Sequence, residues 1–267
     1  TNDKAQSTGI ALDPAGAPSV IVDEANAGTT DLTTGLAPVI TRMKTIITAD
    51  MLNNSTPVVA TPLTSMAVEV AASKTPSSAD TLQQALDAAQ GTVKSTLGFG
   101  LGESVDLFTA SPVLTDDADT EEERKQVAAY RLAVEAVSAV LNTVATQTGN
   151  ATGATGVLSD MAQDLADGSI DTTLSGVNGV DLEVANLKIP GTNISVTDIA
   201  TVLNNETATL GSSQTVDPSE VPAPEPVATV ADTDYDGVLD DIDNCVNVAN
   251  PDQRDDNGND IGAACEA

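Results

Sequence analysis

The sequence predicts a mainly α-helical protein: a bundle-like body with minor β structure near the N-terminus, and an irregular tail at the C-terminus. Hydrophobic residues make up 40% of the chain but aromatic residues only 1%. A core of Ala, Val, Leu and Ile buries little area per residue, which favours closely packed helices. Apolar residues recur every three or four positions in 120–147, and the composition becomes Pro-rich and then acidic after residue 210.

Residues 1–36 are rich in Gly, Thr, Asp and Pro, and we expect an extended segment with one strand at 18–24 (PSVIVDE). The mainly helical body then covers 37–210. Its first helix is expected at 37–52, where five apolar residues follow helical spacing: Val39, Ile40, Met43, Ile46 and Ile47.

Two further helices are predicted by their capping residues. Thr61 as N-cap and Pro62 at the first helical position predict a helix that runs to about Ser73. Ser77 or Ser78 could cap the next helix, whose buried stripe is expected to contain Leu82, Leu86, Ala89, Val93 and Leu97.

The clearest helix is expected at 120–147, because Thr120 and Glu123 form a capping-box pair. Its heptad-like apolar positions indicate a core helix of a bundle, with an intermolecular seam as the alternative: Val127, Tyr130, Val134, Val137, Leu141 and Val144. Shorter helices are expected at 155–167 and at 196–206, the latter capped by Thr197 or Asp198. Residues 174–196 are expected to hold short strands or an ordered loop.

Residues 211–231 contain four prolines, no basic residue and no buried pattern, so we expect an extended linker. An acidic segment, 232–267, completes the chain and contains both cysteines. The formal net charge of −30 argues against nucleic acid and anionic membrane surfaces as partners. No apolar stretch approaches the length of a membrane span. Because the chain starts at Thr1, an upstream segment is expected to have been removed or left out.

The acidic segment opens with carboxylates at alternating positions of a twelve-residue loop, followed by a glycine at the sixth position, Gly237. Ca²⁺ takes six to eight oxygen ligands, which such spacing can supply. The oxygen donors would be the side chains and one backbone carbonyl of Asp232, Asp234, Asp236, Val238 (carbonyl), Asp240 and Asp243. A solvated acidic run is the alternative. A Pro-rich segment before the loop and Asn244-Cys245 after it do not predict the helices of an EF-hand.

The run from 232 onward resembles the thrombospondin type 3 repeat. Three motifs carry the resemblance, in order and spacing: Asp243-Asn244-Cys245, Asn250-Pro251-Asp252-Gln253 and Ala264-Cys265. The resemblance covers about 35 residues and implies a compact unit wrapped around Ca²⁺ with almost no apolar core. A second, weaker loop would use Asp255, Asn257, Asn259 and Glu266, since Asp260 stands at a glycine position and Ala263 replaces an acid.

Cys245 and Cys265 are the only cysteines, and they enclose about twenty residues. The resemblance and the lack of a core in this segment point to a disulfide, which implies an oxidising compartment. Free thiols are the alternative. A zinc site is disfavoured because the chain has two thiols and no histidine.

Phrases of the body at 61–72, 96–115 and 128–141 are similar to a helical module of large secreted or surface-anchored bacterial proteins. This resemblance implies a structural or adhesive role outside the cell. An enzyme is not expected: histidine is absent, and Ser73-Lys74 and Lys94-Ser95 are helix neighbours that would not face each other.

Two functions therefore remain. The first is a non-enzymatic Ca²⁺-binding structural protein, either a surface adhesin component or a filament subunit that associates with itself or with other surface proteins. In a filament, the strand at 18–24 could complete a neighbour's sheet. The alternative is a non-catalytic or ligand-binding module of a larger secreted hydrolase.

Overall fold

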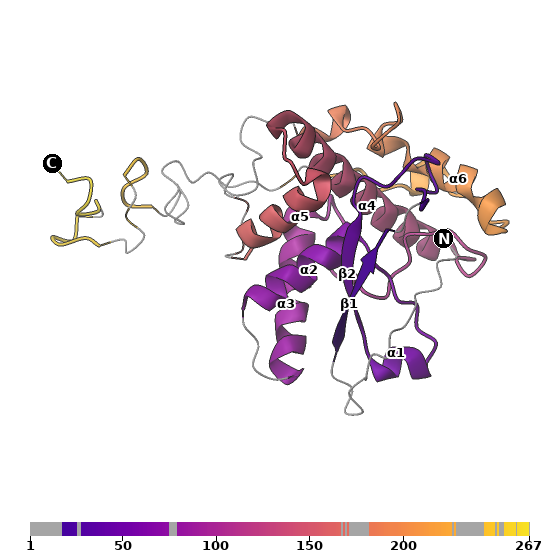
Figure 1. Cartoon of the computed structure of the whole chain (residues 1–267), viewed down its shortest axis with the longest axis horizontal. Coiled ribbons are helices and arrows are strands. Elements are labelled where there is room, and N and C mark those ends of the chain that lie inside the picture. Colours follow the sequence, from indigo (N-terminus) through magenta and orange to yellow (C-terminus); the bar gives the residue numbers. More distant parts are fainter. Residues whose placement is uncertain are drawn as a thin grey trace.

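The computed structural model describes residues 18–25, 28–74, 79–166, 168, 170, 182–225, 227, 243–248, 250, 254–259 and 261–266. The fold is mainly α with a two-stranded sheet near the N-terminus, as the sequence predicts (Figure 1). In chain order the strands and α-helices are β1 (Ser19–Glu24), β2 (Arg42–Ile47), α1 (Ala49–Asn53), α2 (Pro62–Ser73), α3 (Ala79–Leu97), α4 (Glu121–Thr148), α5 (Gly153–Asp164) and α6 (Ile199–Leu210).

Helix α4 is the central helix of the body and packs against α2, α5 and α6. Thr120 and Glu123 form the predicted capping box at its start, and Gly149 ends it in a left-handed conformation. The predicted apolar seam faces the interior of the chain itself, since Tyr130, Val137 and Leu141 are fully buried. The core-helix interpretation is therefore confirmed, and the seam is not available to a second chain.

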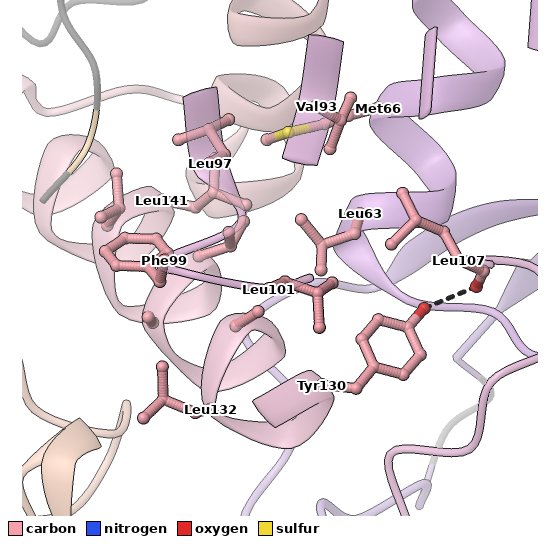
Figure 2. Close-up of a cluster of buried hydrophobic side chains, with 14 of the residues drawn as sticks. Leu63, Met66, Val93, Leu97, Phe99, Leu101, Leu107, Tyr130, Leu132 and Leu141 are labelled. Carbon is pink, nitrogen blue, oxygen red and sulfur yellow. Dashed lines mark hydrogen bonds between the residues drawn. The ribbon is translucent and has the colours of Figure 1, made fainter. Parts of the chain in front are cut away.

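Leucines and Tyr130 fill the space between α2, α3 and α4 (Figure 2). The Tyr130 hydroxyl donates a 2.6 Å hydrogen bond to the Leu107 carbonyl and lies 3.2 Å from the Thr61 hydroxyl, so its polar end is satisfied inside the core. Burial raises the pKa of Tyr130 well above its usual value. The loop of residues 98–120 is thereby tied to the start of α2.

The predicted capping of α2 is confirmed. For α3, the predicted apolar stripe is described, but the predicted caps are not. Thr61 caps α2 in a box with Thr64, and Pro62 occupies the first turn. Ser77 and Ser78 lie outside the described residues. The predicted stripe of α3 faces the core: Leu86, Ala89, Val93 and Leu97 are buried, and Leu82 packs against them.

The predicted helix at 37–52 is wrong over most of its length. Residues 42–47 form β2, which pairs antiparallel with β1, and only the last residues enter α1. Apolar spacing over so short a run fits a helix and a strand equally well. Tertiary partners decide: β1 pairs with one edge of β2, and the Lys44 backbone on the other edge bonds to Ser65 and Thr64 of α2.

The later helices begin and end at slightly different residues from those predicted. Helix α5 starts at Gly153 rather than at 155, and α6 follows a 3-10 turn (Val196–Asp198) and continues to Leu210. Asp198 occupies the N-cap of α6, as one of the predicted alternatives, but makes no side-chain cap hydrogen bond. In the described part of 174–196 there is a 3-10 turn (Val184–Asn186) and one bridge, Lys188–Ser195.

Residues 211–225, the described start of the predicted linker, pack on the body. Asn204 of α6 donates to the Val216 carbonyl at 2.9 Å and accepts from the Val216 amide at 2.8 Å. Val216 is buried, contrary to the expectation of no buried pattern. Glu220 pairs with Arg124 at 3.0 Å, and the Glu225 amide donates to the Phe99 carbonyl.

Candidate metal centre in the disulfide-closed tail

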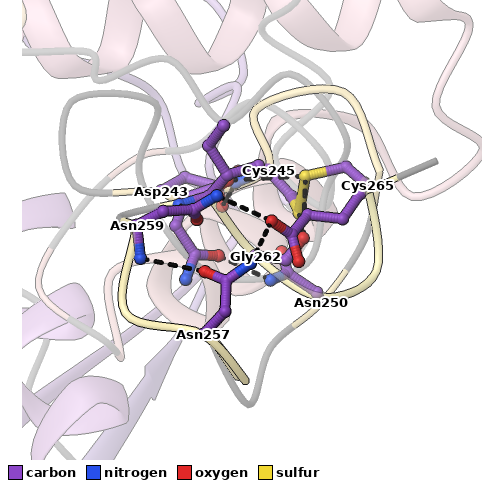
Figure 3. The surroundings of a disulfide bond; sticks show 10 residues. Asp243, Cys245, Asn250, Asn257, Asn259, Gly262 and Cys265 are labelled. Atoms are coloured by element: carbon purple, nitrogen blue, oxygen red, sulfur yellow. Dashed lines mark hydrogen bonds between the residues drawn. A yellow bond between two sulfur atoms is a disulfide. The ribbon is translucent and has the colours of Figure 1, made fainter.

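The disulfide predicted for the tail is present. Cys245 and Cys265 are joined with a Cα–Cα distance of 5.7 Å (Figure 3). Backbone bonds hold the two ends together: the Gly262 amide donates to the Asn244 carbonyl at 2.8 Å, and the Cys265 amide donates to the Gly262 carbonyl at 3.0 Å. The segment is therefore closed by a covalent bond and by a turn at Gly262.

Gly262 occupies a position that tolerates no side chain. A Cβ there would lie 2.3 Å from the Asn244 Oδ1 and 2.5 Å from the Cys245 Sγ. Asn250, from the Asn-Pro-x-Gln motif, is buried beside them and donates to the Asn244 Oδ1 at 2.7 Å. The sequence reasoning did not single out Gly262. Its position three residues before the second cysteine was the available signal.

The residues of the predicted second Ca²⁺ loop come together. Asn257 and Asn259 both donate their side-chain amides to the Glu266 Oε1, at 2.8 and 2.7 Å. Asp255 Oδ1 accepts from the backbone amides of Asn257 and Gly258, at 3.0 and 2.7 Å. Asn257, Asn259 and Glu266 are therefore joined through their side chains, and Asp255 bonds to the backbone of the same loop.

The backbone of this loop repeats one local motif, in which a side-chain oxygen accepts from the amide two residues later. Asp255, Asn257 and Asn259 do this in succession. Gly258, the fourth position of the loop, is left-handed, with φ +74°. The sixth position, Asp260, lies outside the described residues.

The first loop is described only at its last residue. Asp232, Asp234, Asp236, Val238 and Asp240 lie outside the described residues. Asp243 accepts a 2.8 Å hydrogen bond from the Cys245 amide through its Oδ1, which links the end of this loop to the disulfide. Assignment of the first loop as a Ca²⁺ site stays a prediction.

The donor set of the second loop suits a hard cation. Carboxylate and amide oxygens are the ligands Ca²⁺ prefers, and rotation of the two amides would turn their oxygens toward Glu266. Only two of the four side chains, Asp255 and Glu266, carry charge. Within the described part of the chain no group of three or more Asp, Glu, Cys or His residues could hold a metal ion. The second loop therefore offers two carboxylates and two amide oxygens to a cation, and its use as a Ca²⁺ site stays a prediction.

The body contains a buried ionic cluster that the sequence reasoning missed. Arg131 of α4 makes a bidentate pair with Glu206 of α6, at 3.0 and 2.7 Å, and its Nε donates to Glu135 at 2.8 Å. Thr33 joins the cluster by accepting from Arg131 and donating to Glu206. Burial raises the pKa of Glu135, and Arg131 counteracts this. Spacing of Arg131 and Glu135 on one helix was the only sequence signal.

The lysine–serine neighbours that were weighed as catalytic pairs bind backbone carbonyls instead. Lys74 donates to the Ala166 carbonyl, and Lys94 donates to the carbonyls of Glu103 and Val105. The hydroxyls of Ser73 and Ser95 donate to carbonyls of their own helices. In these contacts the lysines join helices to loops, and neither serine faces its neighbouring lysine.

One helix of the described chain, α4, is long and apolar enough to cross a membrane, but most of its apolar stretch is buried in the body. The buried core helix of a folded domain can have the same length and apolar composition as a membrane-spanning helix. No family model, no curated protein and no solved structure matches this chain. The resemblance of the tail to thrombospondin type 3 repeats thus depends on the motifs quoted above.

Proposed function

We propose that this protein is a non-enzymatic, extracellular Ca²⁺-binding structural protein, either a component of a bacterial surface or the subunit of an extracellular filament. The disulfide-closed loop carries this proposal, because the Asn257 and Asn259 side chains meet at Glu266 and Asp255 lies two residues before Asn257 in the same turn. Its donors are all oxygen atoms, as Ca²⁺ requires. The more acidic loop at 232–243 is the stronger site.

Three further features support the proposal. A disulfide is typical of proteins outside the reducing cytosol. A net charge of −30 favours a medium rich in cations, where screening reduces self-repulsion. The chain has no histidine, the commonest general base.

The Ca²⁺ sites can be tested with Tb³⁺, which replaces Ca²⁺ and luminesces when a nearby tyrosine is excited. Tyr235 lies between Asp234 and Asp236, whereas the other tyrosine, Tyr130, is buried in the body. We expect Tb³⁺ luminescence that Ca²⁺ displaces at millimolar or lower concentration, roughly 10⁻⁴ to 10⁻³ M for extracellular sites. Isothermal titration with Ca²⁺ gives the affinity directly.

Two matched double variants each remove two negative charges, one from the acidic tail and one from the body. Asp234→Asn with Asp236→Asn is expected to weaken Ca²⁺ binding at least about tenfold, since the ligand charge sets affinity. Asp50→Asn with Asp117→Asn makes the same change at exposed positions of the body and is expected to leave binding unchanged. Equal losses in both variants, or no Ca²⁺ binding by the wild type, would contradict the proposal.

Electron microscopy with and without a chelator tests the filament version. Filaments that fall apart when Ca²⁺ is removed support it. A monodisperse monomer unaffected by chelator contradicts the filament, and favours the alternative in which this chain is a module of a larger secreted protein.

A further inference from the structure

The two edges of the small sheet differ in how they are covered. The outer edge of β2 is covered at Lys44, whose amide and carbonyl bond to Ser65 and Thr64 of α2 at 2.8 Å each. In folded proteins an uncovered edge strand is a template for pairing with another strand. β1 is the other edge of the sheet, and its outward backbone groups decide whether it is such a template.

The register shows which residues of β1 point outward. Ser19 pairs with Ile47, and the Ala25 amide bonds to the Thr41 carbonyl in the same register. Since hydrogen-bonded pairs alternate in an antiparallel ladder, the odd-numbered residues of β1 bond to β2. The amide and carbonyl groups of Val20 and Val22 therefore point outward, and they make no hydrogen bond to any other described residue.

The side chains on this edge are apolar and exposed. Val20 and Val22 are 45% and 44% exposed, and both lie on the face of the sheet that carries Lys44. Val20 also lines an open groove of about 330 Å³, together with Val68 and Ala72 of α2 and with polar residues: Lys44, Glu69, Ser73 and Gln163. No charged residue interrupts the edge between Ser19 and Val22.

An antiparallel pairing of two copies of β1 keeps like charges apart. When two copies of β1 lie antiparallel with Ile21 opposite Ile21, Val20 of each copy lies opposite Val22 of the other. Asp23 then lies opposite Ser19, and Glu24 opposite Pro18, so no two acidic residues face each other. A parallel pairing in register would instead place every acid beside its counterpart.

We propose that a second copy of this chain pairs with β1 in this antiparallel register, joining the two hairpins into one four-stranded sheet. A two-stranded hairpin gains stability from added strands, and the four valines meet on one face. The same surface of each copy takes part, and a two-fold rotation axis relates the two copies, so the contact closes as a dimer. This inference rests on the structural role proposed above only in its choice of partner, because the contact contains no Ca²⁺ ligand.

The register is tested with single cysteine variants, which is possible because both native cysteines are bonded to each other. At Ile21, the two copies would bring their Cα atoms to about 4.5 Å, within reach of a disulfide. Ile21→Cys is therefore expected to yield covalent dimer under mild oxidation, and Leu36→Cys, at a 54% exposed position, to stay monomeric. Cross-linking through Val22→Cys but not Ile21→Cys would overturn the register.

Association itself is measured by sedimentation equilibrium from roughly 10 µM to 1 mM, with about 0.5 M NaCl to screen the charge of the chain. We expect a concentration-dependent dimer in the wild type. Val22→Lys should abolish it, and Leu36→Lys should not. A wild type that stays monomeric over the whole range, or a Val22→Lys variant that dimerises like the wild type, overturns the proposal.

Two readouts separate this proposal from the Ca²⁺ proposal. Hydrogen exchange should slow at the Val20 and Val22 amides as the protein concentration rises, and Val22→Lys should remove that protection at Val20. The same variant should keep the wild-type Ca²⁺ affinity. A wild type that binds Ca²⁺ but does not dimerise contradicts the pairing of β1 and leaves the Ca²⁺ proposal standing. A wild type that dimerises but does not bind Ca²⁺ contradicts the Ca²⁺ proposal alone.

Discussion

The helical body and the disulfide-closed tail are stabilised by different physical means. In the body, α2 to α6 enclose a continuous cluster of buried aliphatic side chains. Among the described tail residues, only Cys245, Asn250 and Gly262 are buried, while Val248 and Ile261 are 42% and 47% exposed. The body excludes water from apolar surface, whereas the tail depends on a covalent link and on Asn and Asp side chains that bond to its own backbone.

The acidic side chains have different partners in the two regions. Where charges enter the body, they are matched: Arg131 lies between Glu135 and Glu206 in a buried cluster. In the tail, Asp255 accepts hydrogen bonds from backbone amides, and Glu266 accepts them from the side-chain amides of Asn257 and Asn259. We therefore expect the body to fold independently of cations, and the tail to be ordered further by them.

The largest effect is expected from Arg131→Met. It leaves Glu135 and Glu206 buried without their cation, which costs about 4 kcal/mol of unfolding free energy at pH 7. Because folding raises the pKa of Glu135, the contribution of this group is present at low pH and declines as pH rises through the folded value. The loss should therefore shrink as the pH is lowered toward about 4.

Urea unfolding followed by circular dichroism, at pH 7 and at acidic pH, measures this loss. Arg124→Met is the matched control, because Arg124 pairs with Glu220 in a more exposed place and its removal should cost about 1 kcal/mol or less. If the two arginines cost the same, the buried cluster contributes nothing special to the body.

The second effect compares equal truncations in the two regions. Leu141→Ala removes a fully buried side chain and should lower the unfolding free energy by about 3 kcal/mol. Ile261→Ala removes an exposed side chain of the tail and should change it by less than about 0.5 kcal/mol. Thermal and urea unfolding of both variants give the comparison. A large loss from Ile261→Ala would reveal an apolar core in the tail.

The smallest effect on the body is expected from breaking the disulfide. Cys245→Ser with Cys265→Ser breaks the bond that closes a loop of 20 residues. We expect it to destabilise the ordered tail by about 3 kcal/mol and to leave the stability of the body unchanged. Limited proteolysis should cleave the tail faster, and more so without Ca²⁺, while the melting temperature of the body stays unchanged. A lower melting temperature of the body would show that the two regions fold as one unit.

Much of the fold could be predicted from local signals. Thr61-Pro62 and Thr120 with Glu123 act on the turn that follows them, so α2 and α4 begin where the sequence indicates. The side chains of Asp255, Asn257 and Asn259 likewise act locally, because each accepts a hydrogen bond from the backbone amide two residues later. The Cys245–Cys265 disulfide was implied by the resemblance of the tail to thrombospondin type 3 repeats and by its lack of an apolar core, and the structure contains it.

Other features depend on contacts between distant residues. Residues 42–47 have spacing that suits a helix, and they became β2 because β1 and the hydroxyls of Thr64 and Ser65 supply bonds to its two edges. The Arg131 cluster joins α4 to residues near 33 and 206, which no local pattern brings together. Asn204 likewise holds Val216 in a segment whose composition is that of a linker.

The sequence by itself determined the starts of α2 and α4 and the apolar faces of α3 and α4, since each depends on neighbours within a few turns, and its motifs implied the disulfide. Tertiary structure decided the strand at 42–47, the buried ionic cluster and the packing of 211–225 on the body. In each of these, a polar group is satisfied by a partner far along the chain. Burial makes such pairing necessary, and only the folded arrangement says which partner supplies it.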